Sequence, residues 1–155
     1  FHYNFTMRDL ANVVRGLLNS RPKEYVTTIQ LNRLWYHEVL RVFGDRLVTD
    51  VEVQRCRELA IDNGKRAMEE DAENVYSNPV IFTNFTSSKG DELGTYLPCE
   101  NMELLKQSLE NQLNLYNESN PIMNLVLFEQ AMLHVTRIAR ILLFPGGNAL
   151  LVGVG

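Results

Sequence analysis

Two glycines near the end of the chain have the spacing with which a phosphate-binding loop begins. The apolar run 149–152 leads directly into Gly153-Val154-Gly155. In a P-loop, backbone N–H groups that follow a buried strand turn inward and bind phosphate at the start of the next helix. The full motif is GxxxxGK[ST], and the sequence stops before its lysine and its Ser/Thr. A glycine turn after any buried strand has the same pattern, so both interpretations stay open at this point.

The histidines and cysteines do not form a recognisable metal or catalytic motif. His37-Glu38 begins like the zinc motif HExxH, but position 41 is an arginine, so we interpret the pair as polar helix residues. The three histidines are scattered and offer no Ser/His/Asp arrangement. Cys56 and Cys99 lack CxxC spacing, and we expect two free thiols, with a disulfide between them as the alternative.

The segments that must position these residues are mostly helical. Apolar residues recur at helical spacing in five stretches, most of them bounded by capping or breaking residues. Thr49 and Glu52 form a full capping box, and Thr6 and Asp9 form a similar arrangement in which Asp replaces the usual Glu or Gln. Small residues such as Gly64 indicate either close packing of the third helix or a half-exposed helix. The predicted helices cover residues 6–19, 27–43, 50–71, 101–116 and 122–143.

Two further stretches are predicted to be non-helical. Proline and glycine punctuate residues 78–100, which we expect to form a loop with one extended stretch at 80–85. The apolar residues 149–152 are predicted to form a short strand. A lone strand leaves backbone hydrogen-bonding groups unpaired, so its sheet must lie outside these residues or remain unformed.

Composition narrows the class of protein. Hydrophobic residues make up 45% and charged residues 22% of the chain, which favours a folded globular protein over a disordered one. The net charge of −4 provides no basic excess to attract nucleic acid or anionic lipid. No apolar run reaches the roughly 18 residues that a membrane-spanning helix needs. Because the chain starts at Phe1 and stops within an unfinished glycine pattern, we expect both ends to be cut from a longer polypeptide.

Three stretches of the chain match short sequence motifs that occur together in one protein family. The first is Phe1-His-Tyr-Asn-Phe-Thr-Met-Arg-Asp-Leu, and the second is Leu34-Trp-Tyr-His-Glu-Val-Leu-Arg-Val-Phe-Gly-Asp-Arg-Leu-Val48. The third, residues 122–155, contains Asn-Leu-Val-Leu-Phe-Glu and ends in Gly-Asn-Ala-Leu-Leu-Val-Gly-Val-Gly. In this order they resemble dynein heavy chains of the axonemal type, at the junction between the third and fourth AAA+ modules of the motor. Residues 50–100 are only loosely determined by the resemblance.

The resemblance implies a fold and a division into domains. It implies a mainly α fold, in which a helical AAA+ lid bundle is followed by a helix and the first strand of an incomplete α/β P-loop domain. Residues 1–117 would form the lid of one module. Residues 118–155 would form the start of the next module, truncated within its P-loop.

The resemblance also implies two sets of nucleotide-binding residues. Arg8 corresponds to the sensor-2 arginine of the lid, which reaches the terminal phosphates of ATP bound in the third module. The alternative is an exposed arginine in a first helical turn, where the helix dipole mildly disfavours a cation. Leu125, Val126 and Leu127 correspond to the adenine side of the fourth pocket, with plain helix core as their alternative. Gly153 and Gly155 correspond to the first part of the phosphate loop.

The cofactors and partners that the resemblance implies belong to the parent motor. They are ATP or ADP with Mg, the neighbouring AAA+ modules of the same heavy chain, other dynein subunits, and the microtubule through other parts of the parent. We expect no nucleic acid or membrane partner, and a location in the cytoplasm and cytoskeleton, at the ciliary axoneme. Without the P-loop lysine, the Walker B acid and an arginine finger, the chain alone is expected neither to hydrolyse ATP nor to bind it tightly. The alternatives are a stand-alone helical protein-interaction domain without nucleotide chemistry, and a different P-loop ATPase with a helical lid, which would leave the two N-terminal matches unexplained.

Overall fold

The computed structural model of the chain is mainly helical and divides into two compact units. It describes residues 2–68, 73–86 and 94–153. The first unit is Phe1–Phe82 and the second is Thr83–Gly155, and each is described by itself. In the described part of the chain, no helix is long and apolar enough to cross a membrane.

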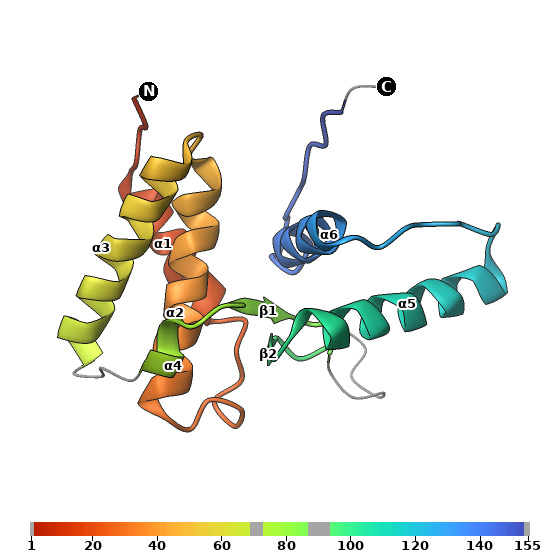
Figure 1. Cartoon of the computed structure of the whole chain (residues 1–155), viewed down its shortest axis with the longest axis horizontal. Coiled ribbons are helices and arrows are strands. Elements are labelled where there is room, and N and C mark those ends of the chain that lie inside the picture. The colour runs from red at the N-terminus through yellow and green to blue at the C-terminus, as the bar shows by residue number, and fades with distance from the viewer. Residues whose placement is uncertain (1, 69–72, 87–93, 154–155) are drawn as a thin grey trace. The chain divides into compact units, whose positions relative to one another are not determined.

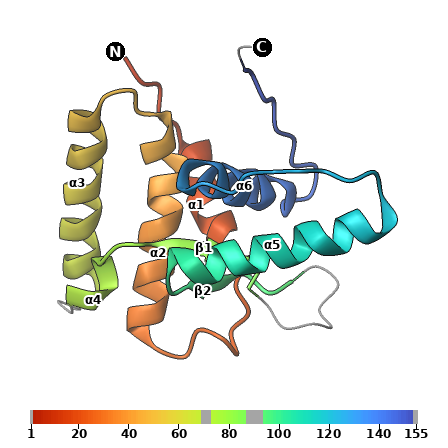
Figure 2. The ribbon, with the colours of Figure 1, turned by 45° about the vertical axis from the view of Figure 1, so that its right-hand side comes forward.

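The first unit is built around one central helix. It contains α1 (Met7–Leu17), α2 (Thr28–Val42), the 3-10 helix η1 (Gly44–Arg46), α3 (Asp50–Met68) and the short α4 (Glu73–Tyr76). Helix α2 lies between α1 and α3 and packs against both, and α4 also packs against α2 (Figures 1 and 2). Because α2 has neighbours on several sides, its residues are buried around much of its circumference.

The apolar core of the first unit lies between α2 and α3. Tyr36, Leu40 and Ala60 are buried together, and Trp35 and Cys56 are among the partly buried residues that pack against them. Burying side chains of this size contributes roughly 1.5–3 kcal/mol each. Trp35 is thus one of the side chains that close this core from its edge.

Two glycines permit close approaches between helices of the first unit. A Cβ atom at Gly16 of α1 would overlap the carboxylate of Glu38 on α2. A Cβ at Gly64 of α3 would lie 2.5 Å from the Tyr76 hydroxyl and 2.9 Å from Oδ1 of Asn32. Close packing of the third helix, one of the two options that its small residues left open, is therefore what the structure has at Gly64.

The second unit contains the helices α5 (Met102–Ser119) and α6 (Glu129–Leu142), which pack against each other. The strand β2 (Leu97–Cys99) packs against α5 and pairs with β1 (Ile81–Thr83), which crosses the boundary between the units, in a two-stranded sheet. Helix α5 begins with the side chain of Asn101 accepting a hydrogen bond from the backbone N–H of Leu104 at 2.8 Å. Leu105 and Leu109 form the buried side of this helix.

The five predicted helices are present, whereas α4, η1 and β2 were not predicted, and two further places differ. The predicted end of the third helix at residue 71 and part of the predicted loop 78–100 lie outside the described residues. The last helix begins at Glu129 instead of residue 122, because residues 122–128 are not helical. The side-chain amide of Asn117 pairs with the backbone at the start of this segment: its oxygen accepts from the backbone N–H of Met123 at 2.9 Å, and its nitrogen donates to the carbonyl of Met123 at 3.1 Å. The predicted strand at 149–152 is not formed either, because no described segment pairs with it. The mainly helical fold itself is confirmed.

Candidate functional site

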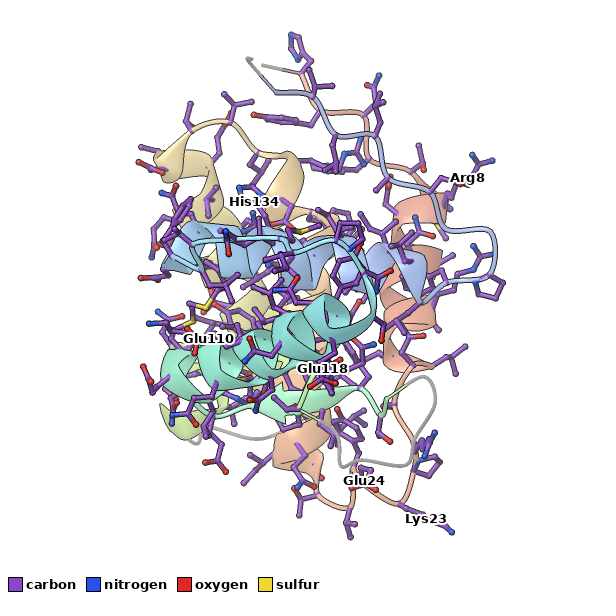
Figure 3. All side chains as sticks on the ribbon, turned by 90° about the vertical axis from the view of Figure 1, so that its right-hand side faces the viewer. Arg8, Lys23, Glu24, Glu110, Glu118 and His134 are labelled. Carbon is purple, nitrogen blue, oxygen red and sulfur yellow. The ribbon has the colours of Figure 1, made fainter. Side chains whose placement is uncertain are left out.

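Arg8 lies in the first turn of α1. Thr6 is the N-cap, so Arg8 is the second residue of the helix, and its side chain is exposed. Figure 3 shows this side chain directed away from the helix. Among the described residues, no hydrogen bond or ion pair is found for the Arg8 guanidinium. A cation beside the positive end of a helix dipole, without a carboxylate partner, is an arrangement that a bound anion would stabilise.

The turn that carries Arg8 is held in place by the adjacent Asp9. One carboxylate oxygen of Asp9 accepts hydrogen bonds from the backbone N–H of Thr6 at 2.6 Å and from its hydroxyl at 3.0 Å. The other oxygen accepts from the guanidinium of Arg46 at 2.9 Å. The capping box predicted at Thr6 is therefore confirmed. The Asp9 carboxylate of this box pairs with Arg46 and not with Arg8.

A second capping box lies at the start of α3. Glu52 accepts hydrogen bonds from the backbone N–H of Thr49 at 3.1 Å and from its hydroxyl at 2.8 Å, as predicted from the sequence. The same oxygen of Glu52 also accepts from the hydroxyl of Tyr3 at 2.7 Å. The backbone N–H of Val48 donates to that hydroxyl at 3.0 Å. Tyr3, Asp9, Arg46 and Glu52, which we call the capping network, thus join residues before α1 and in its first turn to η1 and the first turn of α3.

The hydrogen bonds of the capping network shift the acidity of its groups. The pKa of Asp9 is lowered, first by the backbone N–H of Thr6 and to a smaller degree by the charge of Arg46. The pKa of Glu52 is lowered, first by the hydroxyl of Tyr3 and then by Thr49. The pKa of Tyr3 is raised by desolvation and by its hydrogen bond to Glu52. Both carboxyl groups are therefore held in the charged form that caps a helix.

The three residues expected on the adenine side of the second pocket lie outside any helix. Leu125 and Val126 are exposed, Leu127 is half-buried, and all three belong to the irregular segment between α5 and α6 (Figure 2). Their alternative interpretation as helix core is therefore wrong, because the Asn117–Met123 hydrogen bonds hold the preceding turn in a non-helical conformation. An exposed apolar run of this kind has the character of a surface that another group covers.

The glycine pattern at the end of the chain is only partly described. Gly153 has open space around the position where a Cβ would be placed, and Gly155 lies outside the described residues. Leu150, Leu151 and Val152 before it are exposed. Arg8 belongs to the first unit, whereas Leu125, Val126, Leu127 and Gly153 belong to the second, so the predicted residues fall in two different units.

His37 and Glu38 are buried, which the sequence interpretation as an ordinary polar pair of a helix did not anticipate. Glu38 is 0% exposed and His37 3%. Nδ1 of His37 lies 3.0 Å from the carbonyl oxygen of Val80, and its Nε2 lies 3.9 Å from the carboxylate of Glu38. Among the residues that the structure describes, no group of three His, Cys, Asp or Glu side chains could hold a metal ion. Both side chains lie within the helix contacts of α2.

An apolar groove in the first unit was also not foreseen from the sequence. It has a volume of about 750 Å³, with walls from α1 and α3 and a floor from α2. Leu10 and Val14 of α1 and Leu59 of α3 are among its lining residues and are exposed. The helical spacing of apolar residues in α1 was the signal for this face, but spacing alone does not tell whether such a face is covered.

Two family models match separate stretches of the chain. Residues 1–53 match the family model described as "Dynein heavy chain, ATPase lid domain", and residues 123–155 match "P-loop containing dynein motor region D4". The first match contains Arg8 and the capping network, and the second contains residues 125–127 and the terminal glycines. The two matched regions define a helical lid and the beginning of a P-loop module of the AAA+ class.

Curated relatives cover the whole chain. It is 45% identical over 156 residues to "Dynein beta chain, ciliary" of Heliocidaris crassispina, and 42% identical over 156 residues to "Dynein axonemal heavy chain 17" of Mus musculus. It is 39% identical over 159 residues to "Dynein beta chain, flagellar outer arm" of Chlamydomonas reinhardtii. Each comparison includes 100% of this chain but only 3–4% of the relative's length. The chain belongs to the dynein heavy chain family, as its sequence resemblance predicted.

Proposed function

We propose that this chain supplies a lid and sensor element to one ATP site, and the opening of the phosphate loop to the next, in an axonemal motor ATPase. Within it, Arg8 is the sensor that contacts the terminal phosphates of the nucleotide in the upstream module. Residues 1–117 act as that module's lid, and residues 118–155 begin the following module. The observation that carries this proposal is the exposed Arg8 guanidinium, without an ion-pair partner among the described residues, inside a segment that matches a dynein ATPase lid.

The proposed site residues have side chains or backbone that suit the phosphates and the base of a nucleotide. Arg8 can donate several hydrogen bonds to phosphate oxygens in a fork geometry, and the first turn of α1 adds its dipole. Leu125 and Val126 offer exposed apolar surface for a base, and the open backbone around Gly153 leaves room for a phosphate. When bound in the parent protein, ATP with Mg supplies the hydrolysable phosphate bond. This chain's own part is to bind phosphate at Arg8 and to change the position of α1 as the nucleotide changes.

Variants of Arg8 in the intact heavy chain test the sensor role. ATP is titrated while hydrogen exchange of residues 2–17 is followed, and the ATP concentration that gives half of the protection is measured. Losing a hydrogen bond to a charged group costs about 1.5–3 kcal/mol, so Arg8→Ala is expected to raise that concentration roughly 10- to 100-fold. Arg8→Lys, which keeps the charge but not the fork, is expected to be intermediate.

Arg15 provides a matched control, because it is an exposed arginine in the last turn of the same helix. Arg15→Ala should leave the half-saturating ATP concentration unchanged. The sensor role is contradicted if Arg8→Ala behaves like Arg15→Ala, or if ATP leaves the exchange of residues 2–17 unaltered in the unmodified heavy chain.

The names of the relatives support a proposal for the cellular location and the partners of this chain. Their printed names describe ciliary, flagellar and axonemal dyneins, and this supports an axonemal location and partners within a motor complex. We infer that the neighbouring AAA+ modules of the same heavy chain contact this chain directly, while the microtubule and other dynein subunits are reached through other parts of the parent. Expression of the tagged heavy chain in a ciliated cell, followed by isolation of axonemes, tests the location.

A further inference from the structure

The two capping boxes of the first unit share an unusual property. In each of them the capping carboxylate also accepts a hydrogen bond from a side chain that belongs to another element. Asp9 caps α1 and accepts from Arg46 of η1, and Glu52 caps α3 and accepts from Tyr3, which precedes α1. The first turn of α1 is therefore joined to η1 by a hydrogen bond of 2.9 Å, and the segment before α1 is joined to the first turn of α3 by one of 2.7 Å.

The extended residues between these two links are held as well. Arg46 donates a second hydrogen bond, to the backbone carbonyl of Asn4 at 3.2 Å, and its guanidinium lies over the ring of Phe5 at 5.0 Å. The Phe5 ring stacks on Tyr3 at 6.0 Å and meets Phe43 edge-on at 5.0 Å. The segment before α1 thus has several contacts that resist a change of its length or direction.

Arg8 lies next to a residue of the capping network. Arg8 immediately precedes Asp9, and both lie in the first turn of α1, so a displacement of one backbone position displaces the other. The chain runs from Arg46 to the N-cap Thr49 in three residues. A movement of the first turn of α1 therefore pulls on Arg46 and Tyr3, and through them on the first turn of α3.

We propose that Arg46 and Tyr3 are positioning residues that couple phosphate contact at Arg8 to the first turn of α3. This inference rests on the proposed sensor function of Arg8 and adds the route by which its state reaches a second helix. The ligand is the terminal phosphate of a nucleotide, and the capping network is the connection. Neither positioning residue needs to touch the nucleotide.

The test uses the intact heavy chain, with and without saturating ATP, and hydrogen exchange measured separately for residues 2–17 and 47–60. In the unmodified protein, ATP is expected to change the exchange of both segments. Tyr3→Phe removes only the hydroxyl that bonds Glu52 and keeps the aromatic ring. Arg46→Ala removes the link to Asp9 and to Asn4. In both variants the ATP-dependent change should persist in residues 2–17 and fall by at least half in residues 47–60.

A control separates coupling from stability. Arg55 pairs with Glu58 inside α3 at 3.2 Å, so Arg55→Ala removes an arginine ion pair that does not reach α1. This variant should keep both ATP-dependent changes. A merely structural role for Tyr3 would raise exchange equally with and without ATP, and the difference between the two states would stay as in the unmodified protein.

The outcomes distinguish the two proposals. If Arg8→Ala raises the half-saturating ATP concentration of both segments while Tyr3→Phe and Arg46→Ala leave both responses intact, the sensor function stands and the coupling route is overturned. If ATP never alters residues 47–60 in the unmodified heavy chain, the coupling is also overturned. If Arg8→Ala leaves the half-saturating ATP concentration of both responses unchanged, the sensor function itself fails.

Discussion

The two units of this chain differ most in the apolar surface that they leave exposed. Both bury polar side chains, with Asn32 and Glu38 0% exposed in the first unit and Thr83 1% exposed in the second. In the second unit, large apolar side chains lie on the surface, with Val126 82% and Leu150 90% exposed. The first unit also exposes apolar residues, but many of them line one defined groove between α1 and α3.

The difference follows from how each kind of segment satisfies its backbone. A helix closes its own hydrogen bonds, so α1, α2 and α3 need only side-chain contacts with each other. A strand needs a neighbouring strand for the same purpose. Residues 149–152 have no such neighbour among the described residues, and their apolar side chains are exposed although their composition suits a buried strand. Residues 149–152 therefore differ from α1, α2 and α3 in lacking backbone hydrogen-bond partners rather than in apolar content.

The largest expected effect comes from truncating a buried leucine of the first unit. Leu34 on α2 is 0% exposed, so Leu34→Ala should lower the free energy of unfolding by about 2–5 kcal/mol. Trp35 is the sole tryptophan and lies in the same unit, so its fluorescence during urea unfolding reports this change. The matched truncation Leu150→Ala should have no measurable effect. Equal effects of the two truncations would show that the contrast between the units is wrong.

The next effect tests the contact between α1 and α2. Replacing glycine by alanine within a helix ordinarily stabilises it by about 1 kcal/mol. At Gly16 the added methyl group overlaps the buried carboxylate of Glu38, so we expect Gly16→Ala to destabilise the first unit by about 1–3 kcal/mol instead. Gly153→Ala serves as the control, because nothing lies near its added Cβ. A stabilising Gly16→Ala, measured by urea unfolding, would mean that α1 is not packed this closely.

The smallest effect concerns pH, and it again separates the units. Asp9 and Glu52 cap α1 and α3 as carboxylates with lowered pKa values, whereas α5 is capped by the neutral amide of Asn101. A folded pKa below the unfolded one means that stability is present above the unfolded pKa and is lost as pH falls through the folded pKa. The first unit should therefore lose thermal stability as the pH falls below about 4, where free carboxyl groups take up protons.

Thermal unfolding at a series of pH values, followed by Trp35 fluorescence, measures this loss. The double variant Asp9→Asn, Glu52→Gln should be less stable near neutral pH and should change less on acidification. An acid loss of the same size in the double variant would place the responsible carboxylates elsewhere in the first unit.

Local signals in the sequence were sufficient for most of the helices. The starts of α1 and α3 were predicted because their capping boxes involve residues three positions apart, and both capping boxes are present. The helical fold class could likewise be read from spacing alone. What the sequence could not supply was any feature that depends on a side chain far along the chain. The contacts of Arg46 with Asp9 and of Tyr3 with Glu52 join residues 37 and 49 positions apart.

The incorrect predictions also come from contacts that the local sequence does not reveal. Residues 122–128 have apolar spacing that suits a helix, yet the amide of Asn117, six positions before Met123, holds the backbone in a turn. The burial of His37 and Glu38 could not be foreseen, because polar pairs usually lie on a solvent-facing side of a helix. For the candidate site, the identity of Arg8 came from the resemblance. Its exposure and its lack of an ion-pair partner among the described residues came only from the structure.

The turn held by Asn117 has a consequence for covalent modification. Asn117-Glu118-Ser119 matches the acceptor pattern for N-linked glycans, which are attached to the side-chain nitrogen of asparagine. Here that nitrogen donates to the Met123 carbonyl, and all three residues belong to α5. A sugar at this position would compete with the hydrogen bond that ends the helix in its present direction. Attachment of a glycan to the folded chain would therefore have to displace the Asn117–Met123 hydrogen bond.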